Sequence, residues 1–157
     1  TYLPIFLSEE GADLWFGGAA LSLVQAAGTI GALLGGSWSD RVGRRVLLLI
    51  SLLVSSLLML VFLTLSGWSR LPILVLLGLT SFSTPPVLMA LVQENFPENR
   101  ALANGTYLAL SFVSNSAMVV VVGALADWLG LRQAFTISAA APLLGAPLVL
   151  LLPGRNK

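Results

Sequence analysis

The chain has 157 residues, of which 57% are hydrophobic and 10% are charged, and its formal net charge is +1. Soluble domains carry roughly 25% charged residues, so this composition excludes an ordinary soluble core, and the small net charge gives no field that would attract nucleic acid. Cysteine and histidine are both absent, which excludes disulfides and thiolate metal sites and removes the commonest general base. We therefore expect a membrane protein with no metal, no cofactor and no nucleic-acid partner.

The opening residues, TYLPIFLSEEG, are typical of the last turns of a helix that runs into a loop. The chain begins at Thr1, without a charged leader or a small-residue cleavage site. We therefore expect a fragment of a longer protein, without a signal peptide.

Five stretches follow that are long and apolar enough to cross a membrane, because a helix needs about 20 apolar residues to span a core about 30 Å thick. They are residues 15–36, 46–66, 71–92, 101–126 and 131–152. In lipid every backbone polar group needs an internal partner, and these runs do not alternate as the strands of a barrel would. The predicted fold class is all-α, a polytopic transmembrane helix bundle.

Arginine and lysine are distributed unevenly among the loops between these stretches. Because five spans alternate sides, one side receives six basic residues and the other receives two. The six are Arg41, Arg44, Arg45, Arg100, Arg155 and Lys157, and the two are Arg70 and Arg132. The more basic side is expected to be cytoplasmic, together with the C-terminus. The acidic residues Glu9, Glu10, Asp13 and Asp127 then face outside.

The first stretch is rich in glycine, and it carries polar residues on one face. Gly31 and Gly35 have the small-xxx-small spacing that lets helix backbones approach closely, so we expect a packing contact there. Ser22, Gln25 and Thr29 are three and four residues apart and share a helix face.

The second stretch has no Gly, Pro, Asn or Gln, as a lipid-facing helix requires, and the fifth is also expected at the periphery. The third ends in two prolines, Pro85 and Pro86, which should kink or break its helix. Polar residues mark the first, third and fourth stretches as cavity-facing. The candidates are Ser22, Gln25, Thr29, Thr80, Ser83, Thr84, Asn104, Tyr107, Ser111 and Asn115. The alternative is hydrogen bonding between helices, worth about 0.6 to 2 kcal/mol for each bond.

The segment GGSWSDRVGRR resembles the signature loop of the major facilitator superfamily, with Trp38 in place of the usual small apolar residue. The matching residues are Gly36, Asp40, Arg41, Gly43, Arg44 and Arg45. This resemblance implies the C-terminal half of a twelve-helix transporter. Residues 1–8 would then end helix seven, the five stretches would be helices eight to twelve, and 37–45 would be the cytoplasmic loop. The segments QENFPENRALANG and GALADWLGLRQAF are similar to bacterial fosmidomycin-resistance efflux proteins.

The resemblance also implies roles for the charged residues. Asp40 would be a latch against the missing half, Gly36 would permit close approach, and Gly43 would permit a tight turn. Arg41, Arg44 and Arg45 would bind carboxylates or anionic lipid headgroups, although the arginines alone could simply fix the topology. Glu94 and Arg100 would form a cytoplasmic charge pair.

The resemblance implies a secondary active transporter in the bacterial inner membrane, not an enzyme. It would exchange a drug such as fosmidomycin, or a small amphiphilic metabolite, for protons. The partners would be the lipid bilayer, the small-molecule substrate and the N-terminal half, which would hold the proton carrier because no acid lies within these spans. An uptake permease for a sugar or organic acid, and a non-transporting scaffold, are the alternatives. A membrane enzyme would need a nucleophile and a base that these spans lack.

Overall fold

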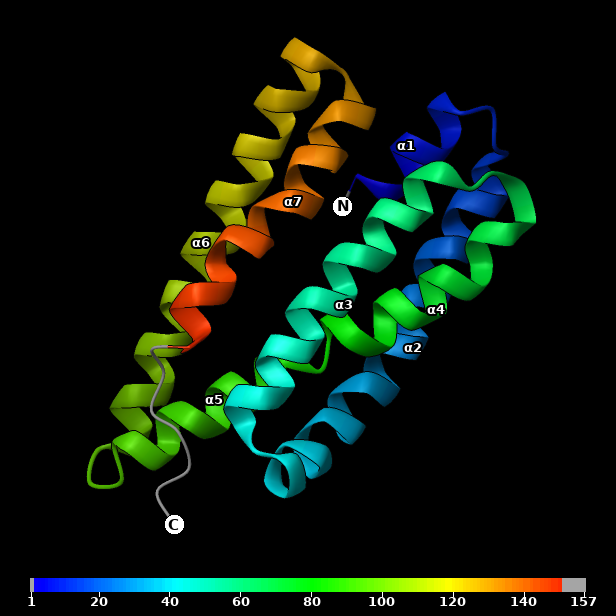
Figure 1. Ribbon diagram of the computed structural model, residues 1–157. Coiled ribbons are helices and arrows are strands. Elements are labelled where there is room, and N and C mark those ends of the chain that lie inside the picture. The colour runs from blue at the N-terminus through cyan, green and yellow to red at the C-terminus, as the bar shows by residue number, and fades with distance from the viewer. Residues whose placement is uncertain (1, 151–157) are drawn as a thin grey trace.

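The computed structural model describes residues 2–150 as a bundle of helices (Figure 1). The elements are α1 (Leu3–Glu9), α2 (Leu14–Val42), α3 (Arg44–Thr64), the 3-10 turn η1 (Gly67–Ser69), α4 (Arg70–Ser81), α5 (Thr84–Asn95), α6 (Arg100–Leu129) and α7 (Leu131–Leu150). Residues 2–150 contain no strand, so the predicted all-α class is confirmed. The predictions for Arg155, Lys157 and the end of the fifth stretch lie outside the described residues.

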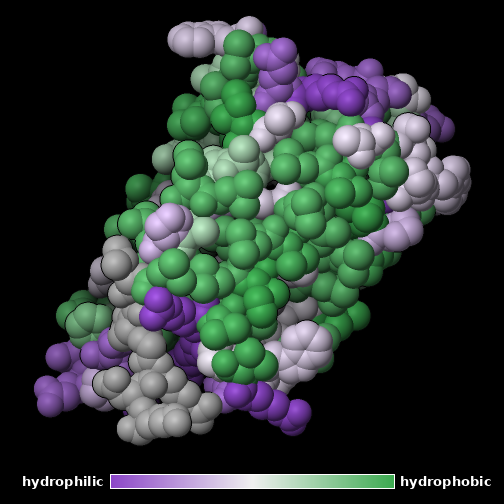
Figure 2. All heavy atoms as spheres, in the orientation of Figure 1, coloured by the Kyte–Doolittle hydropathy of each residue, from purple (hydrophilic) through white to green (hydrophobic). Residues whose placement is uncertain are grey.

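Five helical segments are long and apolar enough to cross a membrane, and each overlaps one of the five predicted stretches. They are Leu14–Val42, Arg44–Thr64, Gly67–Asn95, Arg100–Leu129 and Leu131–Leu150. Figure 2 shows a hydrophobic band across the middle of one face, with hydrophilic residues gathered towards both ends. The exposed indoles of Trp15, Trp68 and Trp128 lie at one end of the spans and that of Trp38 lies near the other. Tryptophan prefers the membrane–water interface, so these side chains fit the expected boundaries of the hydrocarbon core.

The crossing of α2 and α4 is the most extensive contact between two helices (Figure 1). Gly31 and Gly35 of α2 are buried in it, and a Cβ at Gly35 would come within 2.6 Å of the Cβ of Ser83. A Cβ at Gly31 would collide with the backbone of Leu79. The packing contact expected from the glycine spacing is confirmed, because only glycine leaves room for the two backbones.

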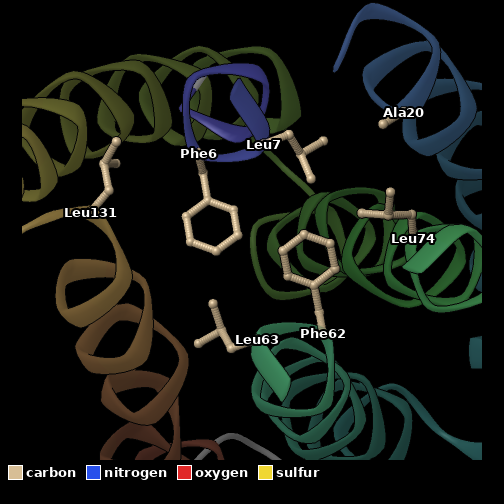
Figure 3. Packing of buried hydrophobic residues seen from close by; sticks show 7 residues of the cluster. All are labelled: Phe6, Leu7, Ala20, Phe62, Leu63, Leu74 and Leu131. Carbon is tan, nitrogen blue, oxygen red and sulfur yellow. The ribbon is translucent and has the colours of Figure 1, made fainter. Parts of the chain in front are cut away.

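The main hydrophobic core lies between α1, α2, α3, α4 and α7, and Figure 3 shows its buried side chains converging from these helices. The core consists of Phe6, Leu7, Ala20, Phe62, Leu63, Leu74 and Leu131. The second predicted stretch is exposed on one side only. Helix α3 exposes Ile50, Leu53 and Leu57, but it buries its other side against α4 and α7. The serines Ser51 and Ser56 lie on the buried side, and they are the sequence signal for it that the prediction did not use.

The third span is broken into two helices at Phe82 and Ser83. Pro85 and Pro86 have no backbone N–H, so they cannot bond the carbonyls four residues earlier. They occupy instead the first turn of α5, where those N–H groups would have no helical partner. The break expected from the two prolines is thereby confirmed, and Figure 1 draws α4 and α5 as separate helices joined by a bend.

Candidate substrate groove and charge clusters

A groove with a volume of about 730 Å³ lies between α5 and α6. Its lining is uncharged and mixes aromatic, aliphatic and small polar side chains. The residues that line it are Pro85, Pro86, Met89, Tyr107, Leu108, Leu110, Ser111, Phe112, Ser114 and Asn115. Helix α6 has no buried residue, so this wall of the groove is open on the described chain. The groove can hold an amphiphilic molecule through apolar contact and a few hydrogen bonds.

Three of the predicted cavity residues line this groove, namely Tyr107, Ser111 and Asn115. They come from one face of α6, as their spacing of four residues predicts. The Tyr107 hydroxyl donates a hydrogen bond to the Pro85 carbonyl oxygen across the groove, with an O···O distance of 3.3 Å. This bond joins α6 to the first turn of α5. Sequence reasoning did not foresee the apolar wall of the groove, because apolar residues in a membrane helix carry no signal of their orientation.

The predicted cavity residues of α2 lie elsewhere. Ser22, Gln25 and Thr29 are all exposed, but none lines the groove. The hydroxyl of Ser22 donates to the Gly18 carbonyl and that of Thr29 donates to the Gln25 carbonyl, at 3.0 and 3.1 Å. These two hydroxyls thus form their hydrogen bonds within their own helix.

The predicted residues of the third span are also outside the groove. Thr80 donates to the carbonyl of Leu76 in its own helix at 2.8 Å, and Thr84 is half-buried at the start of α5. The prediction for Ser83 is wrong, since only 6% of this residue is exposed. Its hydroxyl lies 2.9 Å from that of Ser51 in α3, and this hydrogen bond joins the two helices. The sequence could not reveal this, because a serine that binds another helix has the same spacing as one that faces a cavity.

Asn104 is half-buried on α6, one turn before Tyr107. Its side-chain oxygen is buried and has no hydrogen-bond partner within the described chain. It does not line the groove. Its predicted role in a cavity therefore stays a prediction.

The segment predicted as the loop 37–45 is mostly helical. Residues up to Val42 continue α2, Arg44 begins α3, and Gly43 alone makes the turn with φ +101° and ψ +135°. No proline or glycine interrupts α2 after Gly36, so the helix continues until a residue that tolerates positive φ. The tight turn expected at Gly43 is present. At Gly36 a Cβ would meet nothing within 4 Å in the described chain, so the close approach expected there stays a prediction.

Arg44 is the centre of a charge cluster that also contains Asp40 and Glu94. Its Nη2 atom lies 2.7 Å from a carboxylate oxygen of Glu94 and 3.6 Å from one of Asp40. The Arg44 side chain is 17% exposed, whereas those of Asp40 and Glu94 are 69% and 62% exposed. The cluster therefore ties the end of α5 to the turn between α2 and α3. The predicted pair of Glu94 with Arg100 is wrong, since residues 96–99 separate α5 from α6 and Glu94 faces Arg44 instead.

A second charge cluster, at the opposite end of the bundle, was not predicted. Arg70 is 4% exposed and donates to the Glu10 carboxylate and to the Leu65 carbonyl oxygen, the latter at 2.8 Å. Arg132 approaches the same carboxylate at 3.6 Å and donates to the Leu63 carbonyl oxygen at 3.0 Å. The Arg70 guanidinium also lies 5.5 and 5.1 Å from two aromatic ring centres, those of Phe6 and Phe62. The sequence analysis placed Glu10, Arg70 and Arg132 on the same side of the membrane, and this was the only indication that they could meet.

Within residues 2–150, no group of three acidic, histidine or cysteine side chains could hold a metal ion. The arrangement therefore offers a groove for a neutral or amphiphilic molecule and two charge clusters at the ends of the helices.

A family model described as Major Facilitator Superfamily matches residues 1–157. The sequence is also 35% identical over 130 residues to an uncharacterised MFS-type transporter, YfnC, of Bacillus subtilis (strain 168). That alignment covers 83% of this chain and 32% of the relative, so the chain spans about a third of the relative's length. No solved structure gives a significant match. The placement in the C-terminal half and the fosmidomycin-type subgroup stay predictions. On the match of the whole sequence to the family model, the chain is a multi-pass membrane protein that belongs to the Major Facilitator Superfamily.

Proposed function

We propose that this chain is part of a proton-coupled efflux transporter that exports small amphiphilic compounds by alternating access. The observation that supports it best is the groove between α5 and α6. Its apolar and aromatic wall, with Tyr107, Ser111 and Asn115 beside it, suits a molecule with an apolar body and a few hydrogen-bonding groups. Fosmidomycin is the first drug to test, on the basis of the resemblance in sequence.

In this proposal the chain is the C-terminal half of the transporter, in a bacterial inner membrane, with its C-terminus in the cytoplasm. The N-terminal half closes the open side of the groove, and transport follows when the two halves rock about it. Asp40 then acts as the latch between the halves. Its carboxylate is 69% exposed beside Arg44, so it is free to accept hydrogen bonds from a helix N-terminus of the partner half.

The proton carrier belongs to the N-terminal half in this proposal. Proton relays in membranes rest on an acid or histidine that faces the interior of the bundle. The groove lining contains neither. Lipid headgroups and carboxylates remain the proposed partners of Arg41 and Arg45.

The test is survival of a sensitive bacterium on fosmidomycin and a panel of amphiphilic drugs. The full-length protein is compared with its Asp40→Asn variant and with this chain alone. Asp13→Asn is the matched control, because Asp13 is an exposed aspartate at the other end of α2. We expect protection by the full-length protein and the control, and none by Asp40→Asn or the chain alone. A well-expressed full-length protein that protects against no compound would contradict efflux, and proton-linked uptake would then be measured.

A further inference from the structure

The row of side chains that forms the α5 wall of the groove continues towards α4. Pro85, Pro86 and Met89 line the groove, and Phe82 comes three and four residues before the two prolines. Phe82 and Ser83 keep backbone angles in the right-handed helical region, with φ −81° and ψ −7° for the first and φ −71° and ψ −22° for the second. Residues three and four apart on a helix share a face, so the Phe82 side chain extends the same wall by about one turn.

The Phe82 ring packs on α2 and stays partly open. It lies over Gly28, where a Cβ would come within 2.7 Å of two ring carbons, Cγ and Cδ2. Gly28 is buried, whereas 40% of Phe82 is exposed. The missing side chain at Gly28 thus lets part of the ring contact α2, and the rest of the ring remains available to another molecule.

Gln25 carries a polar group beside this ring. It lies three residues before Gly28, so the two positions are neighbours on the surface of α2. Gln25 is exposed, and the hydrogen bond that it accepts from Thr29 reaches its backbone carbonyl, so its side-chain amide has no partner in residues 2–150. Gln25 comes 11 residues after Leu14, about 16 Å along the helix, and so lies near the middle of a hydrocarbon core about 30 Å thick. An amide without a hydrogen bond is costly in lipid, so this one is expected to face water, a substrate or protein.

The opposite wall of the groove adds two more aromatic side chains. Tyr107 and Phe112 of α6 both line it, and Phe112 is 71% exposed. The lining contains no charged residue. Aromatic rings pack against other rings in stacked or edge-to-face geometries that are favourable beyond ordinary apolar contact. These side chains therefore suit an uncharged compound with an aromatic ring better than an aliphatic or ionic one.

We propose that Phe82 and Gln25 extend the substrate site, and that the compound it takes is an uncharged aromatic amphiphile. The ring of the compound contacts Phe82, and its polar group forms a hydrogen bond with the Gln25 amide. The inference rests on the proposed transport function and names the class of compound that the transporter carries. The competing occupant of this surface is the other half of the protein, which would exclude both water and substrate from it.

The first measurement determines whether water reaches this surface. This chain has no cysteine, so Thr29→Cys, one turn after Gln25 on the same exposed face, is made in the full-length protein with any cysteine elsewhere replaced by serine. The thiol is reacted with a membrane-impermeant methanethiosulfonate. The matched control is Ile50→Cys, an exposed site in α3 that comes 14 residues before the end of its helix at Thr64, whereas Thr29 comes 15 residues after the start of α2. A thiol ionises poorly in apolar surroundings, so Thr29→Cys should react about tenfold faster than the control, or more.

The second measurement determines which compounds protect the Thr29→Cys thiol. Chloramphenicol is the aromatic probe, since it is uncharged and joins a nitrophenyl ring to an amide and hydroxyl groups. Panthenol is the control compound, with an amide and hydroxyl groups but no ring. We expect chloramphenicol to slow the reaction of the thiol and panthenol to leave it unchanged.

Two variants in the Thr29→Cys protein test the named side chains. Phe82→Leu removes the ring contact and should raise the half-protecting concentration of chloramphenicol by about two- to tenfold. Its control is Phe96→Leu, at an exposed aromatic residue outside the groove lining. Gln25→Leu removes one hydrogen bond and should raise the same concentration by about fivefold. Its control is Ser22→Ala, because that hydroxyl bonds within its own helix.

The proposal is overturned if Thr29→Cys reacts no faster than Ile50→Cys, since lipid or the other half would then cover this surface. It is equally overturned if chloramphenicol protects no better than panthenol, or if Phe82→Leu and Gln25→Leu change the protection no more than their controls. None of these outcomes depends on export. A protein that fails the survival assay but is protected by chloramphenicol in this way would lose the efflux function and keep the binding site.

Discussion

Replacing Gly31 by alanine tests the close contact on which the bundle depends. A Cβ at this position would collide with the backbone of Leu79, and a backbone cannot yield by changing rotamer. Overpacking of a tight core costs about 1–3 kcal/mol, and alanine in place of glycine returns up to about 1 kcal/mol of helix propensity. The net expectation is a loss of about 1–2 kcal/mol. At about 2–4 °C for each kcal/mol in a protein of 150–250 residues, and less in a longer one, the melting temperature should fall by up to about 8 °C.

The matched control is Gly36→Ala in the same helix, where a Cβ would meet nothing within 4 Å in the described chain. It should leave the melting temperature unchanged or raise it slightly. Both variants are measured in the purified full-length protein by intrinsic tryptophan fluorescence during heating. Equal stability of Gly31→Ala and the parent, or an equal loss in Gly36→Ala, would refute the argument that backbone contact sets the stability here.

Three further predictions concern the charges, the groove and the membrane boundary. Glu10→Gln removes the negative charge that faces the buried Arg70 guanidinium, so it should lower the free energy of unfolding by about 1–3 kcal/mol. The control Glu9→Gln should leave it unchanged, and both are measured by thermal unfolding. Asn115→Leu should reduce the transport rate at low substrate concentration by about fivefold or more through loss of one hydrogen bond, with Ser116→Leu, outside the groove lining, as the control. Trp128, 86% exposed at the end of α6, should be quenched more by nitroxides at the headgroup than by nitroxides deep in the bilayer. The expectations would be contradicted if Glu10→Gln and Glu9→Gln lowered stability equally, or if Asn115→Leu and Ser116→Leu slowed transport equally. Stronger quenching of Trp128 by nitroxides deep in the bilayer would contradict the third.

The local features of the fold follow from the sequence because they depend on neighbours along the chain. Five apolar runs of membrane length, a helix break before Pro85 and a turn at Gly43 each need only the physics of one segment. The small-residue spacing of Gly31 and Gly35 likewise indicates a close contact, although it does not say that the partner is α4. These predictions agree with the structure.

The partners of polar side chains could not be predicted in the same way. Ser83 and Ser111 are both serines in apolar stretches of membrane length, yet one binds Ser51 inside the bundle and the other lines the groove. Glu94 has Arg100 six residues later but pairs with Arg44, fifty residues earlier. Pairing across helices depends on how the helices are rotated about their axes, and an apolar membrane helix gives a weak signal of its rotation because both lipid and core are apolar.

The two charge clusters differ in a way that bears on which end of this chain can move. At one end Arg70 is almost fully buried, and its loss of Glu10 would leave a charge without a partner, a change that costs about 3–5 kcal/mol in typical buried pairs. At the other end Arg44 is 17% exposed but the carboxylate of Glu94 is 62% exposed, so solvent screens this pair more than the buried one. Breaking the second pair therefore costs less free energy than breaking the first. The Arg70 cluster is thus the fixed end of the chain, and movement is expected at the end where Arg44 meets α5.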